Sequence, residues 1–205
     1  MARIALVDYG AGNLTSVRKG LDAAGAEVFA PQSPDDLSRA DGIVVPGVGH
    51  FAATAALSNG WRAAIATAVE RGTPLLGICL GLQWLFDSSA EAPGVPGLGA
   101  IAGRCERLPP VVKVPHVGWN SLEFTGPSVL LRGLADGTQV YFTHTYAAPL
   151  AEETVAAATH GARFSAAVER DRVFGVQFHP EKSGPSGIRV LTNFVELAAG
   201  SARKT

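Results

Sequence analysis

Short apolar runs alternate with helix-period segments along the first hundred residues of the chain. The predicted strands are the apolar runs at residues 4–7, 28–29, 43–45 and 75–78. The predicted helices, in which apolar side chains share one face, cover residues 14–24, 61–69 and 80–86. Strands that alternate with helices are typical of an α/β domain built around a parallel sheet.

Beyond Gly99 the pattern changes to strands linked by turns. Residues 166–168 and 173–178 flank a predicted hairpin turn at residues 170–172, although no glycine or asparagine marks that turn. An apolar face at residues 188–198 predicts a closing helix. We therefore expect a three-layer α/β domain with a central, mainly parallel but mixed sheet.

Composition narrows the classes of function. The chain has 205 residues, 47% of them hydrophobic and 17% charged, with a formal net charge of −1, which predicts one globular domain over residues 1–205. A near-neutral charge without basic runs argues against nucleic acid and anionic membranes as partners. The most apolar stretch, residues 75–86, is shorter than the about 20 residues of a membrane span, and we find no secretion signal. Two cysteines form no disulfide framework, which suits a reducing cytoplasm.

Cys79 is the first candidate for chemistry. The pattern Gly77-Ile78-Cys79-Leu80-Gly81 has the spacing of a nucleophile elbow, the sharp strand-to-helix turn that presents a reactive side chain. The glycines allow the close backbone approach of such a turn, and the N-terminus of the following helix favours the thiolate. The alternative is an inert core thiol, the usual state of a free cysteine.

His179 and Glu181 follow the last predicted strand. In an extended chain the side chains of residues i and i+2 point the same way, and Pro180 favours that conformation. We therefore expect the carboxylate of Glu181 to orient the imidazole of His179 toward a thiol, as in catalytic triads. A histidine before a turn, without a catalytic role, is the alternative.

Two glycine-containing loops and the remaining histidines are weaker candidates for a functional site. The loop Pro46-Gly47-Val48-Gly49 presents backbone amides suited to an oxyanion, or it is a plain turn. Gly10-Ala11-Gly12 lacks the third glycine and the acidic residue of a dinucleotide site, and Asn13 after it is a good helix N-cap. The five histidines are scattered and neither Cys79 nor Cys105 has a partner at ligand spacing, so we expect no metal and no cofactor.

Taken together, these motifs resemble those of the class I, triad-type glutamine amidotransferases. The matching segments are Asp8-Tyr9-Gly10-Ala11-Gly12-Asn13-Leu14, Pro46-Gly47-Val48-Gly49, Gly77-Ile78-Cys79-Leu80-Gly81-Leu82-Gln83, Lys113-Val114-Pro115-His116-Val117-Gly118-Trp119-Asn120, Tyr141-Phe142-Thr143-His144-Thr145-Tyr146, and Gln177-Phe178-His179-Pro180-Glu181-Lys182-Ser183. They span residues 8–183, and within the family they are most similar to the glutaminase subunits of histidine biosynthesis. The resemblance implies a flavodoxin-like fold and the hydrolysis of L-glutamine to glutamate and ammonia.

The resemblance also implies roles for individual residues. It makes Cys79 the nucleophile that forms a glutamyl thioester, His179 the general base and then acid, and Glu181 the residue that orients His179. The oxyanion hole would be formed, after the loop reorients, by the amide of Leu80 and an amide from Gly47, Val48 or Gly49. The residues that would hold substrate glutamine are Gln83, His144, Thr145 and Tyr146.

A partner chain is implied as well. In this branch of the family, ammonia passes to a barrel-shaped cyclase subunit that forms imidazole glycerol phosphate and an aminoimidazole carboxamide ribonucleotide, and 205 residues leave no room for that domain. We expect a heterodimer that closes over the thiol, because ammonia released to water is protonated. The candidate interface and gate residues are Asn13, Lys113, Pro115, His116, Trp119, Asn120, Tyr141 and Lys182. Trp119 is the expected anchor because aromatic residues dominate binding hot spots.

Two other classes of function compete with this interpretation. A cysteine hydrolase or peptidase on a similar fold also uses an elbow, but Gln83 and the segment 113–120 argue against it. A non-catalytic binding module would leave Cys79 unlabelled by an electrophilic glutamine analogue, and rapid labelling would exclude it.

Overall fold

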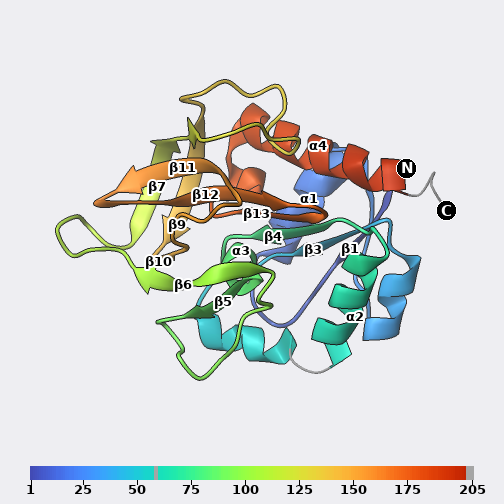
Figure 1. Ribbon diagram of the computed structural model, residues 1–205. Coiled ribbons are helices and arrows are strands. Elements are labelled where there is room, and N and C mark those ends of the chain that lie inside the picture. Colours follow the sequence, from blue (N-terminus) through green and yellow to red (C-terminus); the bar gives the residue numbers. More distant parts are fainter. Residues whose placement is uncertain (58–59, 202–205) are drawn as a thin grey trace.

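The centre of the structure is an eight-stranded sheet (Figure 1). The computed structural model describes residues 1–57 and 60–201. The strands lie in the order β2 (Glu27–Phe29), β1 (Arg3–Leu6), β3 (Gly42–Val45), β4 (Leu75–Ile78), β13 (Val173–Val176), β12 (Ala162–Arg170), β11 (Thr154–His160) and β8 (Glu123–Phe124). The first five are parallel, and each of the last three is antiparallel to the strand before it, so the predicted mixed, mainly parallel sheet is confirmed.

Helices cover both faces of this sheet (Figure 1). Ile4 and Leu6 belong to one apolar cluster and Ala5 to another, because the side chains of a strand alternate between its faces. The first cluster is covered by α1 (Leu14–Ala23) and α4 (Gly184–Ser201). The second is covered by α2 (Gly60–Glu70), the 3-10 helix η1 (Pro34–Arg39) and α3 (Leu80–Leu85). The predicted three-layer fold is confirmed, and within the described ranges no helix is long and apolar enough to cross a membrane.

Two smaller sheets lie toward the end of the molecule at which the parallel strands finish (Figure 1). One contains β10 (Tyr146–Ala147), β6 (Ile101–Arg107) and β5 (Phe86–Ser89), and the other contains β7 (His116–Ser121) and β9 (Gln139–His144). The sequence pattern missed β5, since Phe86 was expected to end a helix. It also missed η1 and the 3-10 helix η2 (Phe51–Leu57), because one or two turns are too short to show a period.

The predicted hairpin near residue 171 is confirmed. Strands β12 and β13 pair antiparallel with Arg170 opposite Val173, so the turn consists of Asp171 and Arg172. Asp171 adopts φ 51°, the left-handed conformation that asparagine or glycine supplies in most such turns. An aspartate tolerates this region better than most residues do, which explains how the turn forms without either.

The turn between β4 and α3 is sharp and closely packed. Cys79 occupies it with φ 55° and ψ −103°, a region that L-residues rarely adopt. A Cβ on Gly77 would lie 2.5 Å from the carbonyl oxygen of Gly81, and a Cβ on Gly81 would collide with the carbonyl oxygen of Val45. Both glycines are therefore required by backbone contacts, as the elbow pattern predicts.

We expect Gly81→Ala to lower the free energy of unfolding by about 2 kcal/mol or more, because the backbone of β3 has to shift to admit the methyl group. The matched control is Gly94→Ala, at an open position where the added methyl group meets nothing within 4 Å and where a change within about 0.5 kcal/mol is expected. Urea denaturation of the two variants measures the difference. Equal stabilities would contradict the packing described for this turn.

Candidate active site

Cys79 is 4% exposed and borders a cavity of about 340 Å³. Its Sγ donates to the carbonyl of Thr143 at 3.8 Å and accepts from Nε2 of Gln177 at 3.6 Å. The other residues that line the cavity are Gly49, Leu80, Gln83, Glu91, Pro115, Thr143, His144, Thr145 and Tyr146. The structure thus brings all four predicted glutamine-binding residues to the same cavity as the thiol.

His179 and Glu181 are in direct contact, with Nδ1 of the imidazole 2.8 Å from Oε1 of the carboxylate, and both side chains are 2% exposed. The extended conformation predicted for Glu181 is wrong. His179 is extended, but Pro180–Lys182 form a 3-10 turn, η3. Pro180 fits the start of such a turn because no N–H is needed there. The predicted contact is made, but a helical turn rather than a strand returns Glu181 to the imidazole.

The surroundings of His179 favour its charged form. Burial by itself lowers the pKa of His179, but the neighbouring Cys79 thiol and the Glu181 carboxylate outweigh burial and raise the pKa to about 9. Nε2 of His179 is buried and makes no well-formed hydrogen bond in this arrangement. It is therefore the free nitrogen of the ring, on an imidazole that readily takes a proton.

Ser183 fastens the histidine segment to β9. Its buried hydroxyl donates to the carbonyl of His179 at 2.7 Å and accepts from the amide of Tyr141 at 3.0 Å. The amide of His179 in turn donates to the carbonyl of Tyr141 at 2.9 Å. Ser183 stands in one of the matching motifs, but the motif does not predict this positioning role, which depends on the contact with β9.

Glu91 is a second residue that sequence reasoning missed. It lines the cavity, and its Oε2 accepts from the amide of Phe51 at 2.7 Å. It lies in a segment without hydrophobic periodicity, so no pattern marks it. The lining of the cavity therefore includes the carboxylate of Glu91.

His144 and His116 form a buried pair across β9 and β7. Nδ1 of His144 donates to the carbonyl of Tyr146 at 2.9 Å, and Nε2 of His144 lies 2.9 Å from Nδ1 of His116. Burial lowers the pKa of His144 to about 3 and the pKa of His116 to about 4. Both rings are therefore neutral, so Nδ1 of His116 donates to Nε2 of His144. Nε2 of His116 is left to accept from the Asn120 amide, 3.4 Å away.

The predicted oxyanion loop lies against the elbow. The amide of Leu80 donates to the carbonyl of Gly47 at 3.3 Å, so it is occupied by the loop itself. Gly47 is buried, whereas Val48 is 38% exposed and Gly49 adopts φ 103°. For the Leu80 amide to bind an oxyanion, the loop has to move away, as the sequence analysis expected.

The predicted interface residues fall into separate groups. Tyr141 lies between Trp119, 6.1 Å away edge to face, and the ammonium of Lys182, 5.9 Å from the ring centre. Pro115 and Lys113 are exposed, and Pro115 borders the cavity. Asn13 caps α1 by accepting from the amide of Ser16 at 3.2 Å. His116, the first residue of β7, is buried with Asn120 donating to its ring and is not presented on the surface.

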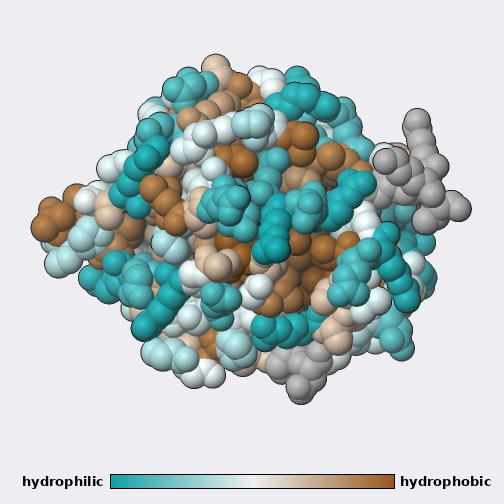
Figure 2. All heavy atoms as spheres, viewed as in Figure 1, coloured by the Kyte–Doolittle hydropathy of each residue, from teal (hydrophilic) through white to brown (hydrophobic). Residues whose placement is uncertain are grey.

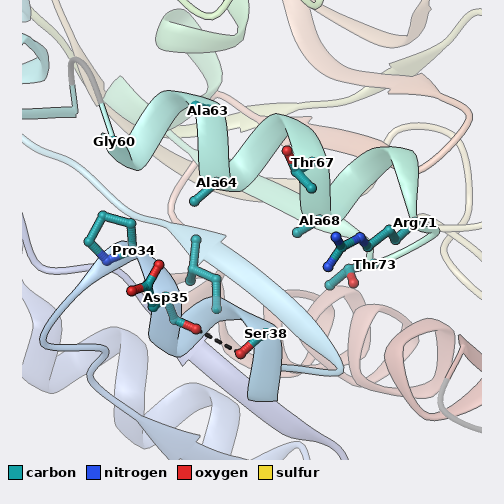
Figure 3. Close-up of a pocket in the computed structure, with 11 residues that line it drawn as sticks. Pro34, Asp35, Ser38, Gly60, Ala63, Ala64, Thr67, Ala68, Arg71 and Thr73 are labelled. Carbon is teal, nitrogen blue, oxygen red and sulfur yellow. Dashed lines mark hydrogen bonds between the residues drawn. The ribbon is translucent and has the colours of Figure 1, made fainter.

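A larger cavity of about 720 Å³ lies between η1 and α2 (Figure 3). Figure 3 shows Ala63, Ala64 and Ala68 along the wall formed by α2, and the hydroxyl of Ser38 donating to the carbonyl of Asp35 at 2.7 Å. Among the residues that the structure describes, no cysteine or histidine lines this cavity. Although this cavity is larger, it offers no reactive group comparable to the thiol of the smaller cavity.

Cys105 differs from Cys79 in its place in the fold and in the pKa of its thiol. It is fully buried in β6, and burial raises the pKa of its thiol well above the ordinary range. Within residues 1–57 and 60–201, no group of three or more histidine, cysteine or acidic side chains is arranged to hold a metal ion. The chemistry of the described chain is therefore concentrated at Cys79.

A thiol, an imidazole and a carboxylate at the carboxyl edge of a flavodoxin-like sheet define the class of cysteine-dependent amidotransferases and hydrolases. The family model described as "Glutamine amidotransferase class-I" matches residues 5–197. The chain belongs to this family and is a glutamine amidotransferase.

Similarity to curated proteins identifies the subfamily to which the chain belongs. The chain is 48% identical to "Imidazole glycerol phosphate synthase subunit HisH" of Moorella thermoacetica, covering 98% of this chain and 99% of that protein. It is 53% identical to the protein of the same name from Gloeobacter violaceus, covering 96% and 90%. Within the class I amidotransferases, the chain belongs to the HisH family.

Solved structures agree on the fold. A structure described as "Crystal structure of glutamine amidotransferase" has a TM-score of 0.74 at 22% identity, covering 96% of this chain and 98% of that one. "Structure of PurLQS from Thermotoga maritima" has a TM-score of 0.76 at 20% identity, covering 96% and 99%.

We expect the pKa values of His179 and His144 to be shifted in opposite directions from the ordinary histidine value of 6.5. Because the folded pKa of His179 is raised to about 9, its contribution to stability is present below pH 6.5 and is lost as pH rises to about 9. His144, with a lowered pKa, destabilises the fold as pH falls from 6.5 toward about 3. Histidine NMR titration, with urea denaturation across the same pH range, measures both effects.

Glu181→Gln is the diagnostic variant for the first shift, because it removes the charge that helps to raise the pKa of His179. That pKa should fall while the pKa of His144 stays low. A single common pKa for the two rings in the wild type would contradict the environments described above.

Proposed function

We propose that this chain is the glutaminase subunit of an imidazole glycerol phosphate synthase, with residues 1–205 as one glutaminase domain. It would hydrolyse L-glutamine and pass ammonia to a cyclase subunit that makes imidazole glycerol phosphate and aminoimidazole carboxamide ribonucleotide for histidine biosynthesis. The observation that carries the proposal is that Cys79, in the wall of the cavity, neighbours the buried pair of His179 and Glu181. Two free cysteines fit a cytoplasmic location.

In the proposed reaction, Cys79, His179 and Glu181 act in successive steps. Nε2 of His179 accepts the thiol proton, and Sγ of Cys79 attacks the carboxamide carbon of glutamine. The tetrahedral intermediate collapses as the imidazolium protonates the departing nitrogen, which leaves as ammonia and leaves a glutamyl thioester. Water then attacks the thioester and gives its proton to His179, and glutamate is released as the thiol re-forms. Glu181 keeps Nδ1 protonated and stabilises the imidazolium throughout.

The cavity offers complementary groups to the rest of the substrate. Both Nε2 protons of Gln83 are used, one toward the carbonyl of Tyr146 at 2.8 Å and one toward Gln177 at 3.2 Å, which leaves its Oε1 as an acceptor. Glu91 supplies a negative charge suited to the α-ammonium group of glutamine. Thr145 completes the wall, and the Leu80 amide with an amide of the 47–49 loop would bind the oxyanion once the loop moves.

Exposed apolar residues suited to a partner occur in segments next to the cavity. Among the described residues, seven large hydrophobic side chains are exposed, and four of them lie on the oxyanion loop, on β7 or on the loop before β7. We call these four the rim patch: Val48, Val111, Val117 and Trp119. Figure 2 shows apolar atoms at the left tip of the molecule, where the loop before β7 protrudes in Figure 1. Exposed apolar residues in the two segments that supply Gly49 and Pro115 to the cavity fit a docked cyclase that shields ammonia from water.

Cys79→Ala should abolish glutamine-dependent synthesis by the two-subunit enzyme, since no thioester can form. Synthesis driven by ammonium salts should continue, because the cyclase then receives ammonia directly. Steady-state assays with each nitrogen source measure the separation, and Cys105→Ala is the matched control that should retain glutamine-dependent activity. Continued glutamine hydrolysis by Cys79→Ala would exclude the proposed nucleophile.

Trp119→Ala should weaken binding of the cyclase subunit about 30-fold, equivalent to about 2 kcal/mol, because Trp119 is a half-exposed aromatic residue and the expected anchor of the interface. Val129→Ala, also an exposed apolar residue but outside the rim patch, should leave the affinity unchanged. Calorimetric titration measures both variants. If the two substitutions had the same effect, the partner would dock elsewhere.

A further inference from the structure

The side chain of Gln177 contacts the sulfur of Cys79, but it belongs neither to the triad nor to the oxyanion hole. Gln177 is 0% exposed and follows the end of β13, where its amide N–H donates to the carbonyl of Ala166 at 2.9 Å. Its Nε2 lies 3.6 Å from Sγ of Cys79, and its Oε1 lies 3.2 Å from Nε2 of Gln83. A fully buried amide with both ends engaged has one fixed orientation.

That orientation follows from one backbone carbonyl. The carbonyl of Tyr146 can only accept, so the Gln83 atom that lies 2.8 Å from it is Nε2 and not Oε1. The same Nε2 contacts Gln177, so the Gln177 atom facing it is Oε1. The nitrogen of Gln177 is therefore the atom turned toward Cys79. The neutral His144 ring strengthens this anchor, because its Nδ1 also donates to the Tyr146 carbonyl.

We propose that Gln177 stabilises the thiolate of Cys79 by donating a hydrogen bond to it, and that Gln83 is the positioning residue that keeps the Gln177 amide turned toward the sulfur. This inference rests on the proposed role of Cys79 as the nucleophile. It adds a group that acts on the sulfur itself, separate from the donors that act on the substrate oxygen.

The other neighbours of the sulfur show why such a donor is needed. The Thr143 carbonyl accepts from the thiol and favours its protonated form, so it opposes ionisation. The titratable groups that face the thiol are His179, which favours the thiolate, Tyr9, whose buried phenol has its pKa raised by burial and by Cys79, neutral His144, and Glu91 on the same cavity. Among these contacts, the Gln177 amide is a neutral donor that can stabilise sulfur charge without itself changing protonation.

The test uses Gln177→Met, which keeps an unbranched side chain of similar length but removes the donor. The apparent pKa of the Cys79 thiol is measured from the pH dependence of alkylation by iodoacetamide, with mass spectrometry assigning the modified cysteine. Loss of the hydrogen bond should raise that pKa by about one unit, and kcat for glutamine should fall about tenfold with little change in KM. Gln177→Glu should raise the pKa further, because a carboxylate cannot donate and repels the thiolate.

Ser165→Ala is the control, since Ser165 is equally buried and hydrogen-bonded but does not contact the sulfur. It should leave the thiol pKa unchanged, so a general loss of packing is distinguished from the loss of the donor. If neither Gln177 variant folds, the NMR resonance of the Gln177 side-chain amide is followed in the wild type across a pH titration. Its chemical shift should change as the Cys79 thiol ionises.

Two results overturn the inference. One is a folded Gln177→Met variant whose thiol pKa equals that of the wild type, and the other is a wild-type Gln177 amide that does not respond to titration of Cys79. Failure of the proposed function looks different: the wild type itself would hydrolyse no glutamine with its partner, or Cys79→Ala would retain that activity.

Discussion

The conformation of Cys79 is the constraint on which the rest of the site depends. A non-glycine residue in this backbone region costs about 1–3 kcal/mol, so the surrounding structure has to maintain it. The amide of Cys79 donates to the carbonyl of Val176 at 2.7 Å, and Gly77 and Gly81 leave room for the neighbouring backbone. The parallel pairing of β4 with β13 therefore does two things at once. It completes the buried sheet, and it places the thiol beside the segment that follows β13 and carries His179.

Two buried imidazoles near this thiol differ in protonation because of their partners and not because of their burial. Burial lowers the pKa of both His179 and His144. Only His179 has a carboxylate and a thiol to stabilise its charge, whereas His144 faces a carbonyl and a neutral ring. One ring can therefore move protons during the reaction. The other is a fixed hydrogen-bond donor, which is what the wall of a binding cavity requires.

Sequence reasoning succeeded where the information is local. Apolar runs predicted β1 to β4, and the glycines beside Cys79 predicted the elbow, because both depend on neighbours in the chain. It failed where contacts join distant segments. The clamp made by Ser183 depends on β9, the place of Glu91 depends on a loop without periodicity, and the orientation of Gln177 depends on the Tyr146 carbonyl. Local sequence does not encode such contacts, since they follow from the order of strands in the sheet.

Activation of the nucleophile and stabilisation of the transition state are separate devices in this chain, and only the first is complete in the arrangement described. The thiol has its base and its amide donor, but the Leu80 amide is occupied by the Gly47 carbonyl. Val48, in the loop that has to move, is exposed and belongs to the rim patch. If a partner binds more tightly to the moved conformation of the loop, that difference in binding free energy shifts the conformational equilibrium of the loop toward the moved state. Under the proposed function, docking and oxyanion binding are thus coupled through one loop, so glutamine is spared when no cyclase is present to receive the ammonia.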